Sequence, residues 1–571
     1  MARNRTDARV LSPARPNRAH SSSTCPASGE HAPTRESAVL DPAHLGDIKG
    51  AFGTIPAHES PGPRTWSSHL KTLLAVIGPG LIVMVGDNDA GAFSTYTQAG
   101  QNYGVRLLWT LLLLVPVLYV NQEMVLRLGA VTGVGHARLI LERFGRFWGS
   151  FSVIDLFVLN ALTIVTEFIG VSLAAGYLGI PKILTVALAA AVIIGSASTG
   201  SFRRFERIAM ALVAGSLLLI PIFLLVHPRA STVLHGLLVP GMPAHAPLSS
   251  AMLLIIAIVG TTVAPWQLFF QQSYVIDKRI TPAFMRYERV DLWLGIVIVV
   301  VGAAAMFGFT AAAFAHTGAQ GHFTNAADVA AGLARHAGHL VGVLFAIALL
   351  DASMIGAAAV GLSTAYAAAD VTGQNHSLHR SVGSAKGFYA TYGALIALSA
   401  ALVLAPHMPL GLLTEGVQTL AGVLLPSATV FLLLLCNDRD VLGPWANSRA
   451  KNVFTAGVIW ILITLSLILT ASVLFSHLSS AQILDILLGG GALGVLAGIG
   501  VTLVARPKAR GPAADSTREE RLTWRMPRST LLERAQLTPG VRVGLVVLRG
   551  YLLVAFGLVV VRVVELATVH H

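Results

Sequence analysis

Long apolar runs constrain this chain more than any other feature, because they recur along almost its whole length with only short polar breaks between them. Most are long enough to cross the hydrocarbon core of a bilayer, which needs about 20 residues of helix. We predict about thirteen spanning helices, at residues 71–98, 105–127, 149–176, 181–199, 207–226, 250–275, 290–315, 338–366, 387–405, 410–436, 452–476, 482–505 and 541–566. With 54% hydrophobic and 12% charged residues, the chain is predicted to be an all-α polytopic membrane protein.

Basic residues set the expected orientation of these helices. The net charge of +12 comes from Lys and Arg in the N-terminal tail and in every second loop, as at residues 138–146, 203–207 and 278–286. Basic loops stay on the cytoplasmic side of a membrane, so we predict a cytoplasmic N-terminus and a protein of the cell (plasma) membrane. Because the basicity follows the loops, the lipid bilayer is the expected partner and nucleic acid is not.

The N-terminal tail differs from the rest of the chain. Residues 1–68 are rich in Pro, Ser, Arg and His and lack the apolar core of a signal peptide, which predicts a disordered cytosolic tail. The two cysteines, Cys25 and Cys436, are too few for a disulfide framework or a cysteine metal site. No Walker A loop, nucleophile elbow or H-E-x-x-H motif is present, so we expect neither an enzyme nor a bound cofactor.

A polar stretch interrupts the first apolar run. Residues 85–92 read V-G-D-N-D-A-G-A, and Asp87 and Asp89 would lie near the middle of the membrane. Each Asp costs roughly 2.5 to 3.5 kcal/mol there on insertion scales, so such residues usually face a cavity or an ion. The alternative is a polar turn between two short helices. The flanking runs argue against it, because together they are about right for one crossing and neither is alone.

The sixth run repeats this pattern. Residues 82–93 and 256–269 both place Val-Gly and then a helix-breaking polar cluster in mid-membrane, and five crossings separate them. Two such copies enter the bilayer from opposite sides, which is typical of inverted-repeat secondary transporters. Chance similarity of Gly- and Ala-rich apolar sequence is the competing explanation.

The repeat predicts how the chain is divided. We expect two repeats of five helices each, followed by about two to three extra C-terminal helices that include a basic linker. These parts are residues 69–240, 241–445 and 446–571, with the linker at 506–540.

The residue types at the two breaks suit a metal cation. Hard divalent cations prefer oxygen ligands, and Mg²⁺ keeps several waters and takes one or two carboxylates. Asp87 and Asp89 would supply the charge, while Asn88 and the carbonyls near Gly86 and Thr261 would supply neutral oxygens. Side chains at i and i+2 diverge on a helix, so both acids reach one ion only if the segment is unwound. We expect Asp89 to bind the ion directly, and Asp87 either to join it or to line the outer approach.

Motifs spread over residues 77–445, about two thirds of the chain, resemble the Nramp divalent-metal transporters, which have a LeuT-like fold. The matching segments are G-P-G-L-I from Gly78, R-L-G-A-V-T-G from Arg127, T-E-F-I-G around Glu167, G-T-T-V-A-P-W from Gly260 and N-D-R-D-V-L-G from Asn437. The resemblance implies a LeuT-like inverted repeat and a divalent metal ion as substrate.

Two departures from the family pattern concern the metal. The family's D-P-G-N motif reads D-A-G-A from Asp89, and its M-P-H motif reads Ala264, Pro265 and Trp266. The thioether that favours soft transition metals is therefore missing at Ala264, and so is the histidine that the family links to protons. An all-oxygen site suits a partly hydrated hard ion. We predict transport of Mg²⁺, with Mn²⁺ as a second substrate, similar to the Nramp-related magnesium transporters. The alternative is a proton-coupled Mn²⁺/Fe²⁺ transporter.

Two further residues take their roles from the resemblance. Gln418 matches the tenth-helix glutamine near the ion, where it would contact metal directly or through water, or else form an interhelical hydrogen bond. Glu167 matches the third-helix glutamate of the family's proton route, but Ile164 replaces the aspartate expected three residues earlier. With Trp266 in place of histidine, we predict weak or absent proton coupling. Glu167 is then expected to be a buried acid that is hydrogen-bonded or protonated.

Two other functions stay open from the sequence. A LeuT-like carrier of amino acids or organic amines would bind a substrate carboxylate at a helix break, which two acids at the first break disfavour. A metal-sensing membrane protein without flux would use the basic tail and residues 506–540 to bind partners.

Overall fold

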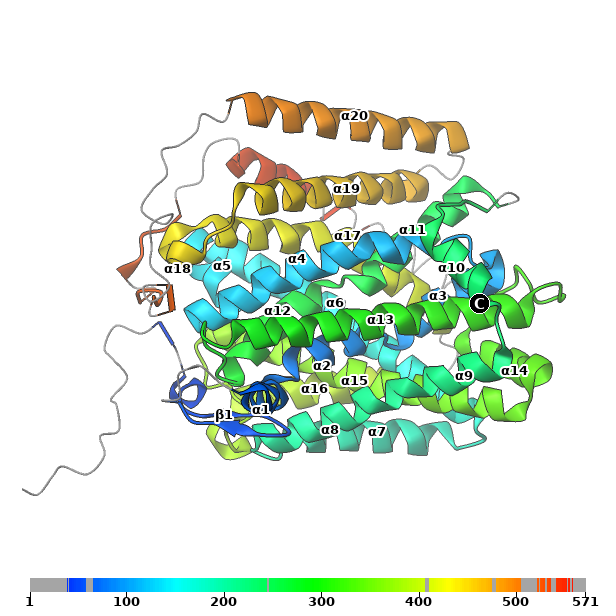
Figure 1. The fold of residues 1–571 in the computed structure, drawn as a ribbon, viewed down its shortest axis with the longest axis horizontal. Helices are drawn as coiled ribbons and strands as arrows, with labels where there is room; N and C mark the ends of the chain where they lie inside the picture. The colour runs from blue at the N-terminus through cyan, green and yellow to red at the C-terminus, as the bar shows by residue number, and fades with distance from the viewer. Residues whose placement is uncertain are drawn as a thin grey trace, which may run out of the picture.

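The computed structural model describes residues 38–39, 41–57, 65–243, 246–405, 410–474 and 479–504, together with 521–522, 524–528, 531–535, 541–551, 553–554 and 557. Most of these residues are helical, and the longest helices run side by side in one bundle (Figure 1). Within the described residues nine helices are long and apolar enough to cross a membrane, or ten if a bent pair counts as one span. The predicted all-α polytopic class is confirmed.

The helices follow the predicted apolar runs closely. The continuous ones are α4 (Trp109–Thr132), α6 (Arg146–Tyr177), α7 (Lys182–Ala197), α8 (Phe202–Gly215), α9 (Leu219–Val226), α13 (Met285–Phe314), α15 (His339–Thr372), α16 (Lys386–Val403), α17 (Leu410–Asn437), α19 (Arg449–Leu474) and α20 (Ser480–Val504). The short elements are α1 (Trp66–Val76), α5 (His136–Phe144), α10 (Ala230–Leu238), α14 (Ala326–Ala337), α18 (Arg439–Leu442), β1 (Ile48–Lys49), β2 (Thr54–Ile55) and the 3-10 turns η1 (Pro42–His44), η2 (Ser216–Leu218), η3 (Val382–Ser384) and η4 (Gly443–Trp445).

The number of spans is smaller than predicted in the part of the chain that the structure describes. Helix α7 has 16 residues, which is short for an upright crossing. The last predicted run, residues 541–566, lies largely outside the described residues. Helices α19 and α20 lie along one side of the bundle (Figure 1).

Large apolar side chains face outward from the bundle. On α7, Ile183 is 70% exposed and Leu184 and Leu188 are each 60% exposed. On α20, Leu488 and Leu493 are exposed to a similar degree. Soluble monomers rarely leave extended apolar surfaces in water. Together with the apolar spans, this outer surface identifies an integral membrane protein.

Two spans are broken, at the positions that the sequence indicated. The first consists of α2 (Pro79–Gly86) and α3 (Ala90–Tyr103), separated by residues 87–89, and the second consists of α11 (Leu248–Thr262) and α12 (Pro265–Asp277), separated by residues 263–264. Helix α1 precedes α2 with a bend of 50°. The structure therefore favours one broken crossing over the alternative from the sequence, a polar turn between two independent short helices.

Local chemistry explains both breaks. Asp89 has extended backbone angles, and its side chain accepts a hydrogen bond from Ala92 N at 2.9 Å, which caps the start of α3. Pro265 is the first residue of α12, a position where its missing N–H costs nothing. Each second half-helix therefore has its own start signal.

Glycines bring the neighbouring helices close to the broken spans. A Cβ on Gly260 of α11 would lie 2.5 Å from Gly422 N of α17, so the two backbones touch there. A Cβ on Gly80 of α2 would lie 2.6 Å from Leu292 N of α13. Small residues permit such close helix contacts in membranes. Helices α4, α6, α13, α15 and α17 surround the two breaks in this way.

The predicted disordered tail, residues 1–68, is too long. Described residues between 38 and 57 form η1 and an antiparallel pair, β1 and β2, in which Ile48 is paired with Ile55. They lie across one end of the bundle, the left end in Figure 1. Local composition could not predict this ordered segment, because its partners are charged residues far away in the sequence, such as Arg279 and Arg380.

Candidate metal site at the two helix breaks

A side-chain hydrogen bond joins the two breaks. Gln267, in the first turn of α12, donates from Nε2 to Oδ1 of Asp87, the residue that follows α2. Gln122 on α4 donates from Nε2 to Gln267 Oε1 at 2.9 Å. All three side chains are buried. Gln122 and Gln267 were not predicted from the sequence to be site residues. Each is an amide inside an apolar run, and this feature could have indicated them, because an amide inside a bilayer needs a polar partner.

Trp266, the second residue of α12, packs against the end of α2. Its side chain is fully buried, and its Cη2 atom would lie 3.6 Å from a Cβ on Gly86, the last residue of α2. Its backbone carbonyl accepts a hydrogen bond from Ser363 Oγ at 2.9 Å. Because an indole offers no oxygen ligand, Trp266 can form a wall of the site but cannot bind a metal.

The side chains of Asp89 and Glu167 lie side by side at the start of α3. Glu167 Oε2 also accepts from Ala90 N at 3.1 Å, and both carboxyl groups are buried. Gly356 on α15 permits this approach, since a Cβ there would lie 2.7 Å from Glu167 Oε2 and 2.9 Å from Asp89 Cβ. Two buried carboxylates this close would repel each other, so a proton or a bound cation between them would stabilise the pair.

Gln418 reaches the same place from α17. A Cβ on Gly91 would collide with Gln418 Nε2 and would lie 3.1 Å from Asp89 Oδ1. The amide therefore lies directly against the backbone that follows Asp89, and only a glycine leaves room for it. The structure brings Asp89, Glu167 and Gln418 together around the start of α3.

The other predicted site residues are placed differently. The Asn88 side chain faces α13, where its Nδ2 donates to Val299 O at 3.2 Å. Asp89, the next residue, instead lies beside Glu167. Thr261 is buried in the last turn of α11. Ala264 is buried at the N-cap of α12, where it supplies no side-chain ligand.

Several buried oxygen atoms at the breaks have no hydrogen-bond partner among the described residues. They are Asp87 Oδ2, Asn88 Oδ1, Gln122 Oε1, Glu167 Oε1 and Thr261 Oγ1. Buried polar atoms are rarely left unpaired, because each costs about 1 to 3 kcal/mol. Carboxylate, amide and hydroxyl oxygens are the ligand types that hard divalent cations prefer.

A cation at this place would need further ligands in addition to the acidic side chains. No group of three or more His, Cys, Asp or Glu residues in the described chain could hold a metal ion. Amides, backbone carbonyls freed at the two breaks and water would have to complete the coordination. This fits the preference of hard cations for neutral oxygens beside one or two carboxylates.

The fold and the site define a class of protein. Two broken spans that meet at buried carboxyl and amide groups are the arrangement of the LeuT-like transporters, which form substrate sites from discontinuous helices. The predicted LeuT-like fold is confirmed.

Comparisons with known proteins then define the family. The family described as "Natural resistance-associated macrophage protein-like", or Nramp, matches residues 80–472. The "Divalent metal cation transporter MntH" of Ralstonia nicotianae is 31% identical over 411 residues, which cover 69% of this chain and 88% of the relative. The protein of the same name from Aeromonas hydrophila is 26% identical over 400 residues, or 66% of this chain and 90% of the relative. This chain belongs to the Nramp family.

Solved structures agree on the fold. The crystal structure of a single-site mutant of the Eremococcus coleocola manganese transporter matches with a TM-score of 0.59 and 21% sequence identity. The match covers 80% of this chain and 97% of that one, and a complex of the same transporter with an aromatic bis-isothiourea substituted compound matches equally well. These relatives are named as transporters and not as enzymes, in agreement with the sequence analysis.

Proposed function

We propose that this protein moves a divalent metal cation across the membrane by alternating access around the two helix breaks. One observation carries the proposal: Asp89, Glu167 and Gln418 meet at the first break, in a bundle whose breaks leave buried oxygens unpaired. Membership of the Nramp family supports it, because the curated relatives are divalent metal cation transporters.

The comparison with relatives supports Mn²⁺ as the substrate of this protein. Solved structures with the same fold include those of a manganese transporter. This supports the alternative from the sequence, an Nramp transporter of Mn²⁺ and Fe²⁺, better than the main prediction of Mg²⁺. Mn²⁺ also accepts carboxylate, carbonyl and water oxygens, so the oxygen-rich breaks are compatible with it.

Mg²⁺ is the second candidate, and one observation favours it. The residue that would offer a thioether in the family motif is Ala264, at the start of α12. Without sulfur a site loses the ligand that discriminates against hard ions, so Mg²⁺ would compete better than in a sulfur-containing site.

Proton coupling is part of the proposal, in place of the weak or absent coupling predicted from the sequence. Asp89 and Glu167 are buried carboxyl groups that lie side by side, and a proton held between them relieves the repulsion of two negative charges. A cation that binds the Asp89 carboxylate would compete with that proton. Metal binding and proton release are then linked at the same pair of carboxyl groups.

We also propose that the N-terminus is cytoplasmic and that the membrane is the cell membrane. Arg203 at the start of α8, Arg279 just after α12 and Arg380 in the loop after α15 all contact the N-terminal segment at one end of the bundle. Basic residues gathered at one end support this orientation through the positive-inside rule.

Reconstitution into liposomes with a pH dye inside tests these points together. We expect saturable Mn²⁺ uptake accompanied by a change in the pH of the lumen, and Mg²⁺ uptake or competition at higher concentration. Asp89→Asn should abolish uptake, whereas Asp351→Asn on α15, an acid outside the site, should not. Uptake that survives Asp89→Asn would refute the site. Saturable Mn²⁺ binding without flux would instead identify a sensor.

A further inference from the structure

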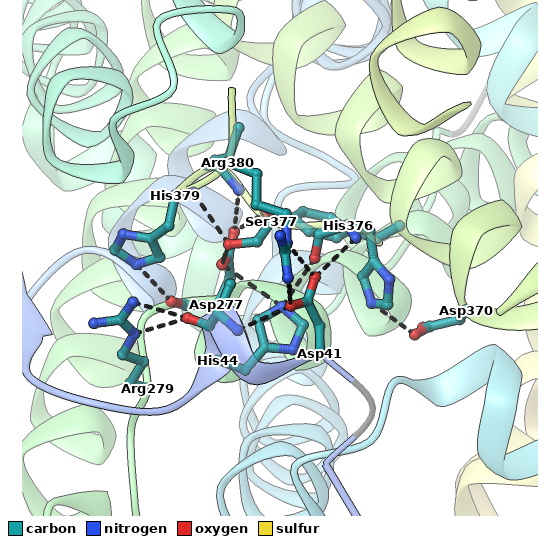
Figure 2. A network of polar contacts seen from close by, with 12 residues as sticks. Asp41, His44, Asp277, Arg279, Asp370, His376, Ser377, His379 and Arg380 are labelled. Carbon is teal, nitrogen blue, oxygen red and sulfur yellow. Dashed lines mark hydrogen bonds and ion pairs between the residues drawn. The ribbon is translucent and has the colours of Figure 1, made fainter. Parts of the chain in front are cut away.

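Described residues from Ala38 to Ala57, here called the N-terminal strap, cross one end of the bundle. The residues that hold the strap come from the start of α8, from the end of α12 and from the loop after α15. Figure 2 shows the central part of this contact, where Asp41 and His44 of the strap meet residues of α12 and of the loop after α15.

Asp41 is the main anchor of the strap. Arg380 donates to its carboxylate from Nη2 at 2.6 Å and from Nε at 2.9 Å, a two-pronged charged contact. The backbone N–H of His376 donates to the same carboxylate at 3.2 Å. Burial alone would raise the pKa of Asp41, but Arg380 and the Ala43 N–H outweigh burial and lower it to about 2. Asp41 therefore stays charged, and the anchor is strong.

A second anchor comes from Arg279, just after α12. Its Nε and Nη2 donate to Ala43 O at 3.0 and 2.8 Å, and its Nη1 donates to Asp47 O at 3.0 Å. The backbone of Arg279 has φ of +67°, which is unfavourable for a residue with a side chain by roughly 1 kcal/mol or more. Three hydrogen bonds to the strap thus depend on a strained conformation, which is a common property of segments that switch.

The hairpin of the strap is tied to α8 and to the bend between α1 and α2. Arg203 donates to Gly50 O and to Gly53 O, each at 3.0 Å. A Cβ on Gly50 would collide with the carbonyl oxygen of Ala75, so the hairpin lies directly on the end of α1.

A buried ion pair continues this contact inward. The backbone N–H of Ala51 donates to Glu206, whose other oxygen accepts from Lys278 Nζ at 2.7 Å. Lys278 also donates to Ile77 O at 2.8 Å, between α1 and α2.

His44 closes a small cavity beneath the strap. The cavity is lined also by Ser273 and Ile276 of α12, by Asp370 and by His376. His44 Nε2 donates to the carbonyl oxygen of His376 at 2.9 Å and lies 3.7 Å from Asp277 Oδ1. Helix α12 begins at the second break and ends under the strap, about 20 Å away at 1.5 Å per residue. The strap therefore covers the end of a helix that leads from the proposed metal site.

We propose that the N-terminal strap is a gate: while it is docked, this end of the transporter is closed, and it must undock before this end opens to the aqueous phase. The inference rests on the proposed transport function. The strap joins α1 and α8, which belong to the first predicted repeat, to the end of α12 and the loop after α15, which belong to the second. Alternating access requires one group of helices to move against the other, and a docked strap opposes that movement.

The contacts of the strap suit a reversible gate. They are mostly hydrogen bonds and ion pairs at a bundle end, with only a few apolar residues buried, among them Ile48 and Ile55. Segments with few buried apolar contacts undock at a lower free energy than the core unfolds.

A disulfide between the strap and α4 tests the gate directly. A Cβ on Gly133 would lie 4.0 Å from Val39 Cβ, which is within the range for a disulfide. In a C25S/C436A background, oxidised V39C/G133C should transport Mn²⁺ at least about tenfold more slowly, because the movement is blocked, and a reductant should restore the rate. Gly133 has φ of +66°, so G133C alone controls for strain. Equal uptake by the oxidised and reduced double variant would overturn the proposal.

A labelling experiment tests the gate without relying on flux or on the Gly133 variant. Ser273→Cys, in the same background, places a thiol in the cavity beneath the strap. An impermeant thiol reagent should label it about tenfold faster when Arg380→Gln removes the charged anchor. Arg335→Gln on α14, which does not contact the strap, should leave labelling unchanged. Equal labelling in both variants overturns the gate. Altered labelling without any Mn²⁺ flux would instead refute the transport function and keep the strap as a mobile cover.

Discussion

Gln267 and Asp87 are 180 residues apart in the sequence, and their side chains are hydrogen-bonded in the centre of the bundle. This contact makes one site of two helix breaks that belong to different predicted repeats. Because Gln122 holds Gln267 from the other side, the Asp87 carboxylate has a fixed neutral partner and no cationic one among the described residues. One Asp87 oxygen is left without a partner in the same part of the chain.

Replacing Gln267 should impair transport. In Gln267→Leu the Asp87 carboxylate loses its buried amide partner, which costs about 1 to 3 kcal/mol and corresponds to roughly 5- to 150-fold in Mn²⁺ affinity if Asp87 faces the ion. The KM for Mn²⁺ uptake into liposomes measures this. Gln122→Leu, one contact further away, is the matched control and should have a smaller effect. If both variants keep the wild-type KM, the contact does not serve the ion.

Gly91 should not tolerate a methyl group. Its Cβ would collide with Gln418 Nε2, so Gly91→Ala should displace Gln418 and lower the melting temperature in detergent, with a loss of about 1 to 3 kcal/mol from overpacking. The double variant Gly91→Ala with Gln418→Ala should recover most of the stability without recovering transport. A Gly91→Ala protein as stable as wild type would show that Gln418 has room to move.

A thioether at position 264 should change metal preference. Ala264→Met offers sulfur at the start of α12, and sulfur favours Mn²⁺ and softer ions such as Cd²⁺ over Mg²⁺. Competition by Cd²⁺ and Mg²⁺ during Mn²⁺ uptake measures the preference, with inhibition by Mg²⁺ expected to weaken. Ala264→Leu, of similar size without sulfur, is the control. The same shift with leucine would mean that volume, and not sulfur, causes it.

The buried ion pair under the strap should dominate stability at this end of the bundle. Lys278 and Glu206 are both fully buried and lie 2.7 Å apart. Lys278→Met leaves Glu206 buried and uncompensated, so we expect a loss of about 3 to 5 kcal/mol in the free energy of unfolding. Adding Glu206→Gln should restore part of it. Thermal unfolding in detergent distinguishes the two variants, and similar melting temperatures would contradict the prediction.

The pair formed by His376 and Asp370 should make stability depend on pH. Burial lowers the pKa of His376, but the Asp370 carboxylate, 3.0 Å from its Nε2, outweighs burial and raises it to about 9. Because this pKa lies above the ordinary value of 6.5, the stabilisation is complete below pH 6.5 and is lost as pH rises through about 9. Asp41, with its lowered pKa, stays ionised in this range, and burial lowers the pKa of His44, so that it stays neutral.

Melting temperatures between about pH 6.5 and 9.5 check this prediction. The melting temperature of the wild-type protein should fall across the range, and that of His376→Gln should change less. His336→Gln on α14, outside the strap contact, should behave as the wild type does. An equal decline in all three proteins would assign the pH dependence to other groups.

Much of the fold could be predicted from local sequence. Runs of apolar residues predict the helices, and Asp89 and Pro265 predict where α3 and α12 begin, because a cap and a missing N–H act within one turn. The partners of these residues could not be predicted in the same way. Gln267 and Gln122 show no local pattern that pairs them with Asp87, and no local pattern places the Asn88 amide against Val299 of α13.

The sequence by itself determined that this protein is a helical membrane protein with two broken spans and acids at the first break. Hydrophobicity, helix caps and proline act over short stretches of chain, so their effects can be predicted from the sequence alone. Only the tertiary structure decided that Gln418 lies against Gly91, that Glu167 lies beside Asp89 and that the strap is anchored to Arg380. These contacts depend on how helices far apart in the sequence pack together, and glycines such as Gly91 and Gly356 set how closely they approach.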